Sequence, residues 1–320
     1  MSGKTKKWLI AAAALILAGS LLFMGIMFML KWDFSKLSTV KFETNTHQVT
    51  EHFQNISLDI NTADVEILPA EDGQTQIVCY EETKEKHTVS VVDNTLTIRR
   101  EVTKKWYDYI GISLGSPKIT IYLPAAQYGA LSISGDTCDV SLPKDFLFES
   151  IHIQLSTGDT SCSASATGDI DISASTGDIH LNGSSAANLK LQASTGHITA
   201  TGVNCTGDVT LRVSTGDTTL TDMTCQVLTS NGSTGDITLT NVIASGAFNI
   251  QRTTGDVTFH KCDASALTIN TDTGEVTGSL LTPKIFHTDT DTGDVTVPIS
   301  TEGGLCEITT DTGDITITIG

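Results

Sequence analysis

The chain has 320 residues, 27 of them glycine, with 6% aromatic residues and a formal net charge of −18. Residues 151–320 hold 5 lysines or arginines against 19 aspartates or glutamates, a difference of −14. An acidic surface of this kind excludes binding of nucleic acid through this half of the chain, because that partner requires a basic face. The length suits one elongated domain with attached segments.

The N-terminus predicts a membrane anchor. A basic tail with three lysines, residues 1–7, precedes an apolar run of 23 residues at 8–30, which is long enough to span a bilayer as a helix. The positive-inside rule then places the tail in the cytoplasm and the C-terminal ectodomain outside a cell membrane that is crossed once. A cleaved signal peptide is the alternative, with Ala18-Gly19-Ser20 as its cleavage site, but its apolar region is normally about 7–15 residues long. We expect the anchor.

Two segments separate this helix from the repeats that follow. Residues 31–52 are polar and are interpreted as a stalk, and residues 53–135 as a β-rich cap over the first repeat. Within residues 104–109, Lys-Lys-Trp-Tyr-Asp-Tyr forms a basic and aromatic patch for which we favour an ordinary loop, with a membrane surface or a glycan as alternative partners. Alternating apolar residues and turn signals predict strands in the cap at Ile56–Ile60, Val65–Leu68, Gln76–Tyr80, Thr88–Val92, Thr95–Arg99 and Lys118–Leu123.

Residues 136–320 repeat the tripeptide Thr-Gly-Asp, with small variations, at steps of 19 or 20 residues. A fixed period of about 20 residues is typical of a solenoid, in which each repeat buries its apolar face only by stacking on its neighbours. The register glycines are Gly158, Gly177, Gly196, Gly216, Gly235, Gly255, Gly274, Gly293 and Gly313.

Apolar and polar residues alternate on both sides of each glycine, so each row is expected to contribute two short strands that meet at a glycine corner. Half-period copies at Thr167–Asp169 and Thr206–Asp208 predict a second corner of the same type. The predicted fold is therefore all-β: a stacked, β-helix-like solenoid of about nine rows and two or three strands per coil, about 40 Å long. The β-rich cap and one transmembrane helix complete it.

An acidic column follows the glycines, since eight of the nine rows have aspartate or glutamate at the next position. Like charges one row apart repel by about 1 kcal/mol in water, so either backbone N–H groups or bound cations must offset them. We favour backbone hydrogen bonds and expect no cofactor, with calcium as the alternative. The last rows carry additional aspartates, and the candidate calcium ligands are Asp272, Asp289, Asp291, Asp294, Asp311 and Asp314.

The seven cysteines are odd in number and form no Cys-x-x-Cys motif, which excludes a zinc ribbon of that spacing. Cys205 and Cys225 occupy equivalent positions of successive rows, so a disulfide between them is within reach. We favour the alternative, in which cysteine acts as a small buried apolar residue.

Catalytic motifs are missing as well: the chain has no Gly-x-Ser-x-Gly, no His-Glu-x-x-His and no phosphate-binding loop. We therefore expect a protein that is not an enzyme. A β-helix that cleaves acidic polysaccharide is the enzymatic alternative.

The sequence resembles a bacterial family of adhesin-like proteins with β-strand repeats, which includes LiaG-like membrane-anchored proteins linked to envelope stress in Gram-positive bacteria. The resemblance covers roughly residues 50–320 and rests on the strands Ile56–Ile60, Ala63–Ile67, Leu96–Ile98 and Ile119–Pro124, and on the repeated Ser-Thr-Gly-Asp-Ile. It implies a non-enzymatic protein of the cell surface that adheres to an unidentified surface or envelope ligand through its solenoid faces. The alternative is a cell-envelope stress accessory or scaffold that binds a membrane partner.

The last row of the repeat has no sequence after it that would cover it. Residues 314–320 are thus expected to leave an open sheet edge, which invites pairing with another chain. We predict weak end-to-end self-association of the ectodomain through this edge.

Overall fold

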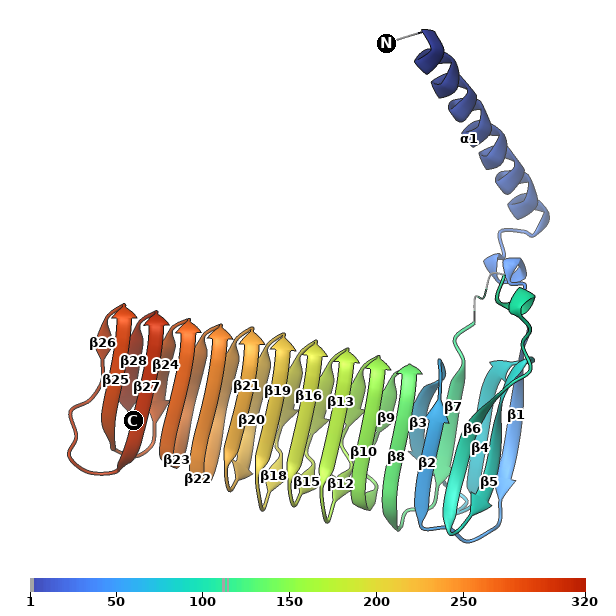
Figure 1. Ribbon diagram of the computed structural model, residues 1–320. Coiled ribbons are helices and arrows are strands. Elements are labelled where there is room, and N and C mark those ends of the chain that lie inside the picture. The colour runs from blue at the N-terminus through green and yellow to red at the C-terminus, as the bar shows by residue number, and fades with distance from the viewer. Residues whose placement is uncertain (1–2, 111–112, 114) are drawn as a thin grey trace.

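The computed structural model describes residues 3–110, 113 and 115–320. A long β-solenoid forms the body of the molecule, and one helix, α1 (Gly3–Met29), stands at its N-terminal end (Figure 1). The segment Thr5–Met29 is long and apolar enough to cross a membrane. Of the predicted tail, residues 1 and 2 lie outside the described residues, and α1 already begins at Gly3. A short 3-10 helix, η1 (Phe34–Leu37), follows α1.

The first face of the solenoid is a parallel sheet that contains one strand from each row. In spatial order its strands are β6 (Thr95–Val102), β2 (Asn55–Ile60), β8 (Gln127–Thr137), β10 (Leu147–Thr157), β13 (Ile170–Thr176), β16 (Leu189–Thr195), β19 (Val209–Thr215), β21 (Leu228–Thr234), the second parts of β22 (Ile237–Thr254) and β23 (Val257–Thr273), β27 (Gly304–Thr312) and β25 (Lys284–Thr292).

The second face follows the glycine corner and is also parallel. Its strands are β7 (Lys118–Leu123), β3 (Asp64–Pro69), β9 (Val140–Leu142), β11 (Thr160–Cys162), β14 (Ile179–Asn182), β17 (Ile198–Thr201), β20 (Thr218–Cys225), the first parts of β22 and β23, β24 (Val276–Leu280), β28 (Ile315–Ile319) and β26 (Val295–Thr296). A short third face contains β12 (Ser165–Ala166), β15 (Ser185–Ala186) and β18 (Asn204–Cys205), and β20 continues it.

The core is made of apolar ladders that run along the stack. Ile170 pairs with Leu189 and Leu189 with Val209, and all three side chains are buried. The predicted alternation of inward and outward residues is thereby confirmed, because only residues at every second position of a strand face the interior. The predicted all-β solenoid is confirmed with it.

Glycine is required at the register corners for two reasons. Gly177 has a φ of 138°, and a Cβ atom there would lie 2.0 Å from the carbonyl oxygen of Gly158 in the preceding row. The glycines therefore allow both the corner and the close stacking of one corner on the next. Gly168 and Gly207, in the half-period copies, lie at another corner, as predicted, but neither is among the positive-φ glycines of the described chain.

The rows at the C-terminal end do not stack in chain order. β27 and β28 lie between the row of β23 and β24 and the row of β25 and β26, so the last row of the chain is inserted before the preceding one (Figure 1). The predicted open edge at residues 314–320 is therefore covered in part, since β28 has a partner strand on both sides at Ile315 and Thr316, whereas residues 317–319 pair with β24 alone. The edge strands at this end are β25 and β26.

The N-terminal end has the same inversion, because the row of β2 and β3 lies between the row of β6 and β7 and the row of β8 and β9. Three antiparallel strands then close this end: β1 (Phe42–Val49), β4 (Thr75–Glu82) and β5 (Glu85–Val92).

The structure thus moves two predicted boundaries. All six strands expected between residues 53 and 135 are present. However, β1 occupies much of the predicted stalk, and the predicted boundary at 135/136 falls inside β8. The reason is that β2, β3, β6 and β7 are rows of the stack rather than parts of a separate cap.

Candidate functional surfaces

The acidic column forms a ladder of hydrogen bonds along the glycine corners. The backbone N–H of Asp178 donates to the Asp159 carboxylate at 2.8 Å, and the N–H of His197 donates to Asp178 at 2.7 Å. At the only non-acidic step, Nδ1 of His197 accepts from the N–H of Asp217 at 3.0 Å. Backbone donors of the next row therefore offset much of the repulsion between the stacked carboxylates.

Four of the six candidate calcium ligands lie outside this ladder. Asp314 belongs to it, because it accepts the N–H of Asp294 at 2.8 Å. The row inversion puts Asp311 between Asp272 and Asp291 in one exposed column, while Asp289 lies in a different column opposite Thr309. In the described parts of the chain, none of the six belongs to a trio of metal-donor side chains with ligand atoms within 4.8 Å of one another. Calcium at these corners stays a prediction.

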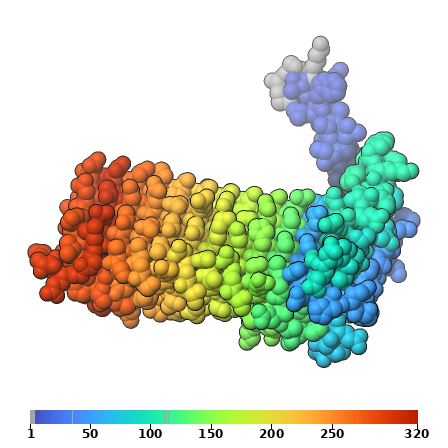
Figure 2. Space-filling model, turned by 60° about the horizontal axis from the view of Figure 1, so that its bottom comes forward, coloured from blue at the N-terminus to red at the C-terminus, as the bar shows by residue number. Residues whose placement is uncertain are grey.

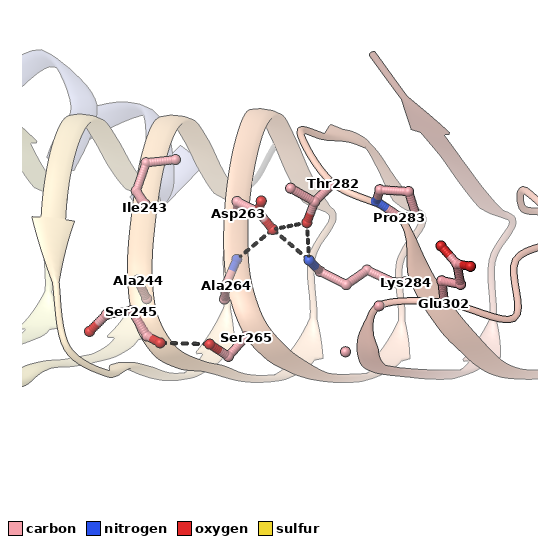
Figure 3. A pocket seen from close by; sticks show the side chains of 12 residues that line it. Ile243, Ala244, Ser245, Asp263, Ala264, Ser265, Thr282, Pro283, Lys284 and Glu302 are labelled. Atoms are coloured by element: carbon pink, nitrogen blue, oxygen red, sulfur yellow. Dashed lines mark hydrogen bonds and ion pairs between the residues drawn. The ribbon is translucent and has the colours of Figure 1, made fainter.

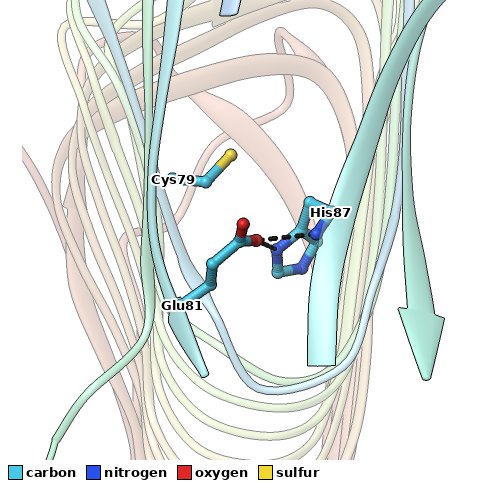
Figure 4. A group of neighbouring side chains, drawn as sticks. All are labelled: Cys79, Glu81 and His87. Atoms are coloured by element: carbon cyan, nitrogen blue, oxygen red, sulfur yellow. Dashed lines mark hydrogen bonds and ion pairs between the residues drawn. The ribbon is translucent and has the colours of Figure 1, made fainter. Parts of the chain in front are cut away.

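A buried cluster at the N-terminal end contains the one trio of donors that does converge, within the described residues. Cys79 and Glu81 point inward from β4, and His87 points toward them from β5 on the opposite wall (Figure 4). Glu81 accepts hydrogen bonds from the backbone N–H and Nδ1 of His87, at 2.6 and 2.8 Å, and from the amide of Asn45 at 2.7 Å.

These donor types suit zinc, but the cluster is already satisfied without it. Burial, with the nearby Glu81 carboxylate, raises the pKa of the Cys79 thiol to about 12, so this residue is a neutral thiol at physiological pH. We therefore interpret Glu81 and His87 as a latch that joins β4 to β5 across the end of the core. The alternation Cys79-x-Glu81 shows in the sequence that both face one side, but nothing there indicates which side.

A second polar feature inside the stack is Arg252, which is fully buried in the middle of the solenoid. Its Nη2 donates to the hydroxyls of Ser230 at 3.1 Å and Thr218 at 3.3 Å, and burial lowers its pKa to about 10, so it stays charged at neutral pH. A Cβ at Gly232 would lie 2.0 Å from its guanidinium. A large neighbour thus explains Ser230, in an otherwise mostly apolar column, and Gly232, which pairs with Arg252 itself.

The cysteines are buried free thiols throughout. Cys205 and Cys225 lie in adjacent rows, next to the paired Asn204 and Thr224, without a disulfide between them. Burial raises their pKa values to about 11 and about 12. They fill the core as small apolar residues do.

A groove of about 570 Å³ lies where the chain folds back at the C-terminal end (Figure 3). Its floor holds the buried Lys284, whose Nζ is 2.6 Å from the Asp263 carboxylate, and Thr282 donates to the same oxygen at 3.0 Å. Ser245, Ser265 and Glu302 line the exposed rim. Sequence reasoning missed this groove, because residues from four segments meet there only through the row inversion.

Comparison with solved structures finds bacterial proteins of low identity. A "putative adhesin" from Parabacteroides merdae has 10% identity over 77% of this chain and 98% of its own, with a TM-score of 0.48. One from Bacteroides fragilis has 15% identity over 87% and 97%, with a TM-score of 0.38, and a "putative lipid binding protein" from Parabacteroides distasonis has 14% over 88% and 98%, with 0.42.

These values are too low to carry a functional argument. No curated protein matches the chain. The profile of the Toastrack DUF4097 family matches residues 53–239 and 206–320, which together span most of the sequence, and the chain belongs to this family.

Proposed function

We propose that the protein is a non-enzymatic, membrane-anchored surface protein that holds a ligand-binding groove away from the membrane, as an adhesin does. The observation that supports this most is the position of the groove of about 570 Å³. Its lining residues belong to the rows of β22, β23, β25 and β27, which are at the end of the rod opposite α1 (Figures 1 and 2). A rigid solenoid is suited to carry such a site at a fixed distance from its anchor.

The anchor in this proposal is α1. Its apolar segment Thr5–Met29 has a mean hydropathy of 2.5, and its side chains are exposed except for Met27. The lysines near its N-terminus favour a cytoplasmic tail and an extracellular solenoid.

The chemistry of the groove favours a neutral polar ligand such as a glycan or an extended peptide. Lys284 already donates to Asp263 and Thr282, so the groove floor offers a paired cation rather than a free one. The rim presents the hydroxyl of Ser245 and the carboxylate of Glu302. The paired lysine and the hydroxyl groups around it suit a ligand that is bound by hydrogen bonds, which supports a binding role.

The test measures retention of the full chain, in lipid nanodiscs, on its own cell wall and on a panel of host-matrix surfaces, with calcium and then with chelator. Ser245→Trp fills the groove and is expected to lower retention by about ten-fold, which corresponds to about 1.4 kcal/mol. Gln226→Trp is the matched control, because Gln226 lies one row back in the same column as Ser245 and outside the groove.

Retention on a foreign surface that Ser245→Trp abolishes and Gln226→Trp preserves supports an adhesin with its site in the groove. Equal loss in both variants, or in neither, contradicts the groove as the binding site. If the protein is retained only on its own cell wall, or on no surface tested, the result favours the alternative role of an envelope accessory that binds a membrane partner.

A further inference from the structure

The loop between β6 and β7 presents a set of apolar side chains to solvent. In the place where other rows have a glycine corner, this row has a longer connection that contains η2 (Trp106–Tyr109). Trp106 is 76% exposed, Tyr109 65% and Ile110 73%, and Tyr107 is half-exposed. Large aromatic residues in a loop normally bury their rings, so this exposure indicates a surface that contacts a membrane or another protein.

The exposed rings are held in place rather than free to turn inward. The Asp108 carboxylate accepts the N–H of Lys105 at 2.9 Å and forms an ion pair with Lys84. Lys104 is bound to the carboxylates of Glu82 and Glu85. The same two lysines of the loop lie over aromatic rings, Lys104 over Tyr109 at 5.4 Å and Lys105 over Tyr107 at 6.0 Å. The loop is therefore pre-organised with its apolar side outward.

The loop lies where the chain leaves α1. Figure 1 shows η2 beside η1, directly below the end of α1. The backbone N–H of Thr83 donates to Lys41 at 3.0 Å, and residues 39–41 line one pocket of about 310 Å³ with Lys84, Lys104 and Asp108. The segment that connects α1 to the solenoid carries its own exposed aromatic residues, Trp32 and Phe34.

The charge at this end differs from that of the rest of the molecule. Residues 31–41 contain three lysines and one aspartate, and residues 99–105 contain four basic residues and one acidic residue. The repeats at 151–320 carry a difference of −14. Near α1, exposed aromatic side chains thus adjoin two segments with a local excess of positive charge, within which Lys104 is paired with Glu82 and Glu85.

We propose that Trp106, Tyr107, Tyr109 and Ile110, together with Trp32 and Phe34, insert into the headgroup region of the bilayer that α1 spans. This inference rests on the proposed membrane anchorage. Tryptophan and tyrosine prefer this region because one part of each ring is apolar and another forms hydrogen bonds, and lysines beside them attract anionic headgroups. With α1 as one attachment and this loop as a second, the rod cannot swing freely about its stalk.

The test uses the full chain in nanodiscs of phosphatidylcholine and phosphatidylglycerol, with Trp8→Phe and Trp32→Phe so that Trp106 is the only tryptophan. The emission of Trp106 is expected to shift to the blue, and to lose intensity when the lipids carry bromine in the upper part of their acyl chains. The matched control replaces Trp106 by Phe and introduces Ile299→Trp, at a fully exposed position near the far end of the solenoid. Its emission is expected to stay that of a tryptophan in water and to be unaffected by bromine.

The anchorage and the loop contact fail in different ways. Intact mass of the chain isolated from membranes shows whether residues 8–30 are retained, and their removal overturns the proposed anchor. A retained helix with Trp106 emission that is as red and as unquenched as that of the control overturns the insertion of the loop and leaves the anchor standing.

Discussion

At both ends of the solenoid the spatial order of the rows departs from the order of the chain, but only the N-terminal end is then closed by further strands. There, β1, β4 and β5 run antiparallel to the rows, and the buried pair of Glu81 and His87 joins the two walls. At the C-terminal end β25 and β26 are left as edges, and Val295 and Ile299 are exposed.

The difference shows that row inversion and end closure are separate devices. Inversion requires that the rows match strand by strand rather than corner by corner, because the row of β6 and β7 takes part although a longer connection replaces its glycine corner. Closure requires strands of opposite direction and polar side chains that end the apolar core. The outermost strands at the closed end, β1 and β5, run antiparallel to their neighbours, whereas β25 and β26 at the C-terminal end continue the parallel rows as open edges. The inverted C-terminal rows in turn create the groove.

The largest effect is expected from breaking the N-terminal latch. Glu81→Ala removes the acceptor of three hydrogen bonds and leaves the two donors of His87 buried without it, whereas the half-buried amide of Asn45 keeps Glu43 as an acceptor. The local free energy of unfolding is expected to fall by about 3 kcal/mol, which speeds hydrogen exchange of the amides in β4 and β5 by more than about 100-fold. Glu307→Ala, at an exposed position near the open end, serves as control and is expected to change stability by less than about 0.5 kcal/mol. Equal effects in the two variants would show that the latch is not what closes the end.

A smaller and more local effect is expected where the last row is inserted. A Cβ at Gly304 would lie 1.7 Å from the carbonyl oxygen of Ser265, so Gly304→Val pushes β27 away from β23 at a cost of about 2 kcal/mol. Limited proteolysis is expected to cleave within residues 284–320 while the preceding rows stay resistant, because a solenoid loses its end rows separately. Gly320→Ala, which meets nothing within 4 Å, is the control. Cleavage spread evenly along the chain would contradict the inserted row.

Most of the fold could be predicted from the sequence, because the same short pattern of apolar, polar and glycine residues repeats in each row. The alternation around Gly177 or Gly196 indicates two strands and a corner, and it predicts the buried columns without any long-range information. The order of the rows is a different matter. Thr290 and Thr310 occupy the same column. The row that contains β25 and the row that contains β27 therefore have the same pattern, and the sequence does not indicate which of the two stacks directly on β23.

The site residues also fall into two groups, those that repeat with the rows and those that occur once. The ladder from Asp159 to Asp178 repeats with the period of the sequence, which is why backbone capping of the corners could be anticipated. The groove at Lys284 and the latch at Glu81 are single occurrences without a period. The groove depends on which non-adjacent segments meet, and the row inversion at the C-terminal end decides that. The latch lies within the hairpin of β4 and β5, but the sequence does not indicate that Glu81 and His87 point into the core.

The open edge at the C-terminal end predicts self-association. We still expect the ectodomain to associate weakly, but through β25 and β26 rather than through residues 314–320. Sedimentation of the full chain in detergent at high protein concentration is expected to show weak, reversible association. Val295→Lys places a charge beside the open edge and is expected to abolish it, whereas Val92→Lys, at an exposed position of the closed end, is expected to leave it unchanged. Strict monomers at every concentration would contradict the idea, and an equal response to both lysines would locate the contact elsewhere.

The smallest effect concerns the exposed column in which Asp311 lies between Asp272 and Asp291. Asp311→Asn removes the central charge of three, so without calcium it is expected to raise the local stability of the last rows by about 0.5 kcal/mol, through loss of repulsion between exposed carboxylates. Hydrogen exchange of β27 and β28 is the measurement. Calcium distinguishes a column that binds a cation from one that does not. If a cation binds there, Asp311→Asn is destabilising in calcium and stabilising in chelator. Unchanged sign in both buffers would refute the calcium prediction at these corners. Asp236→Asn is the control at a position where the carboxylate accepts the N–H of Asp256 at 2.8 Å, and it is expected to be destabilising with or without calcium.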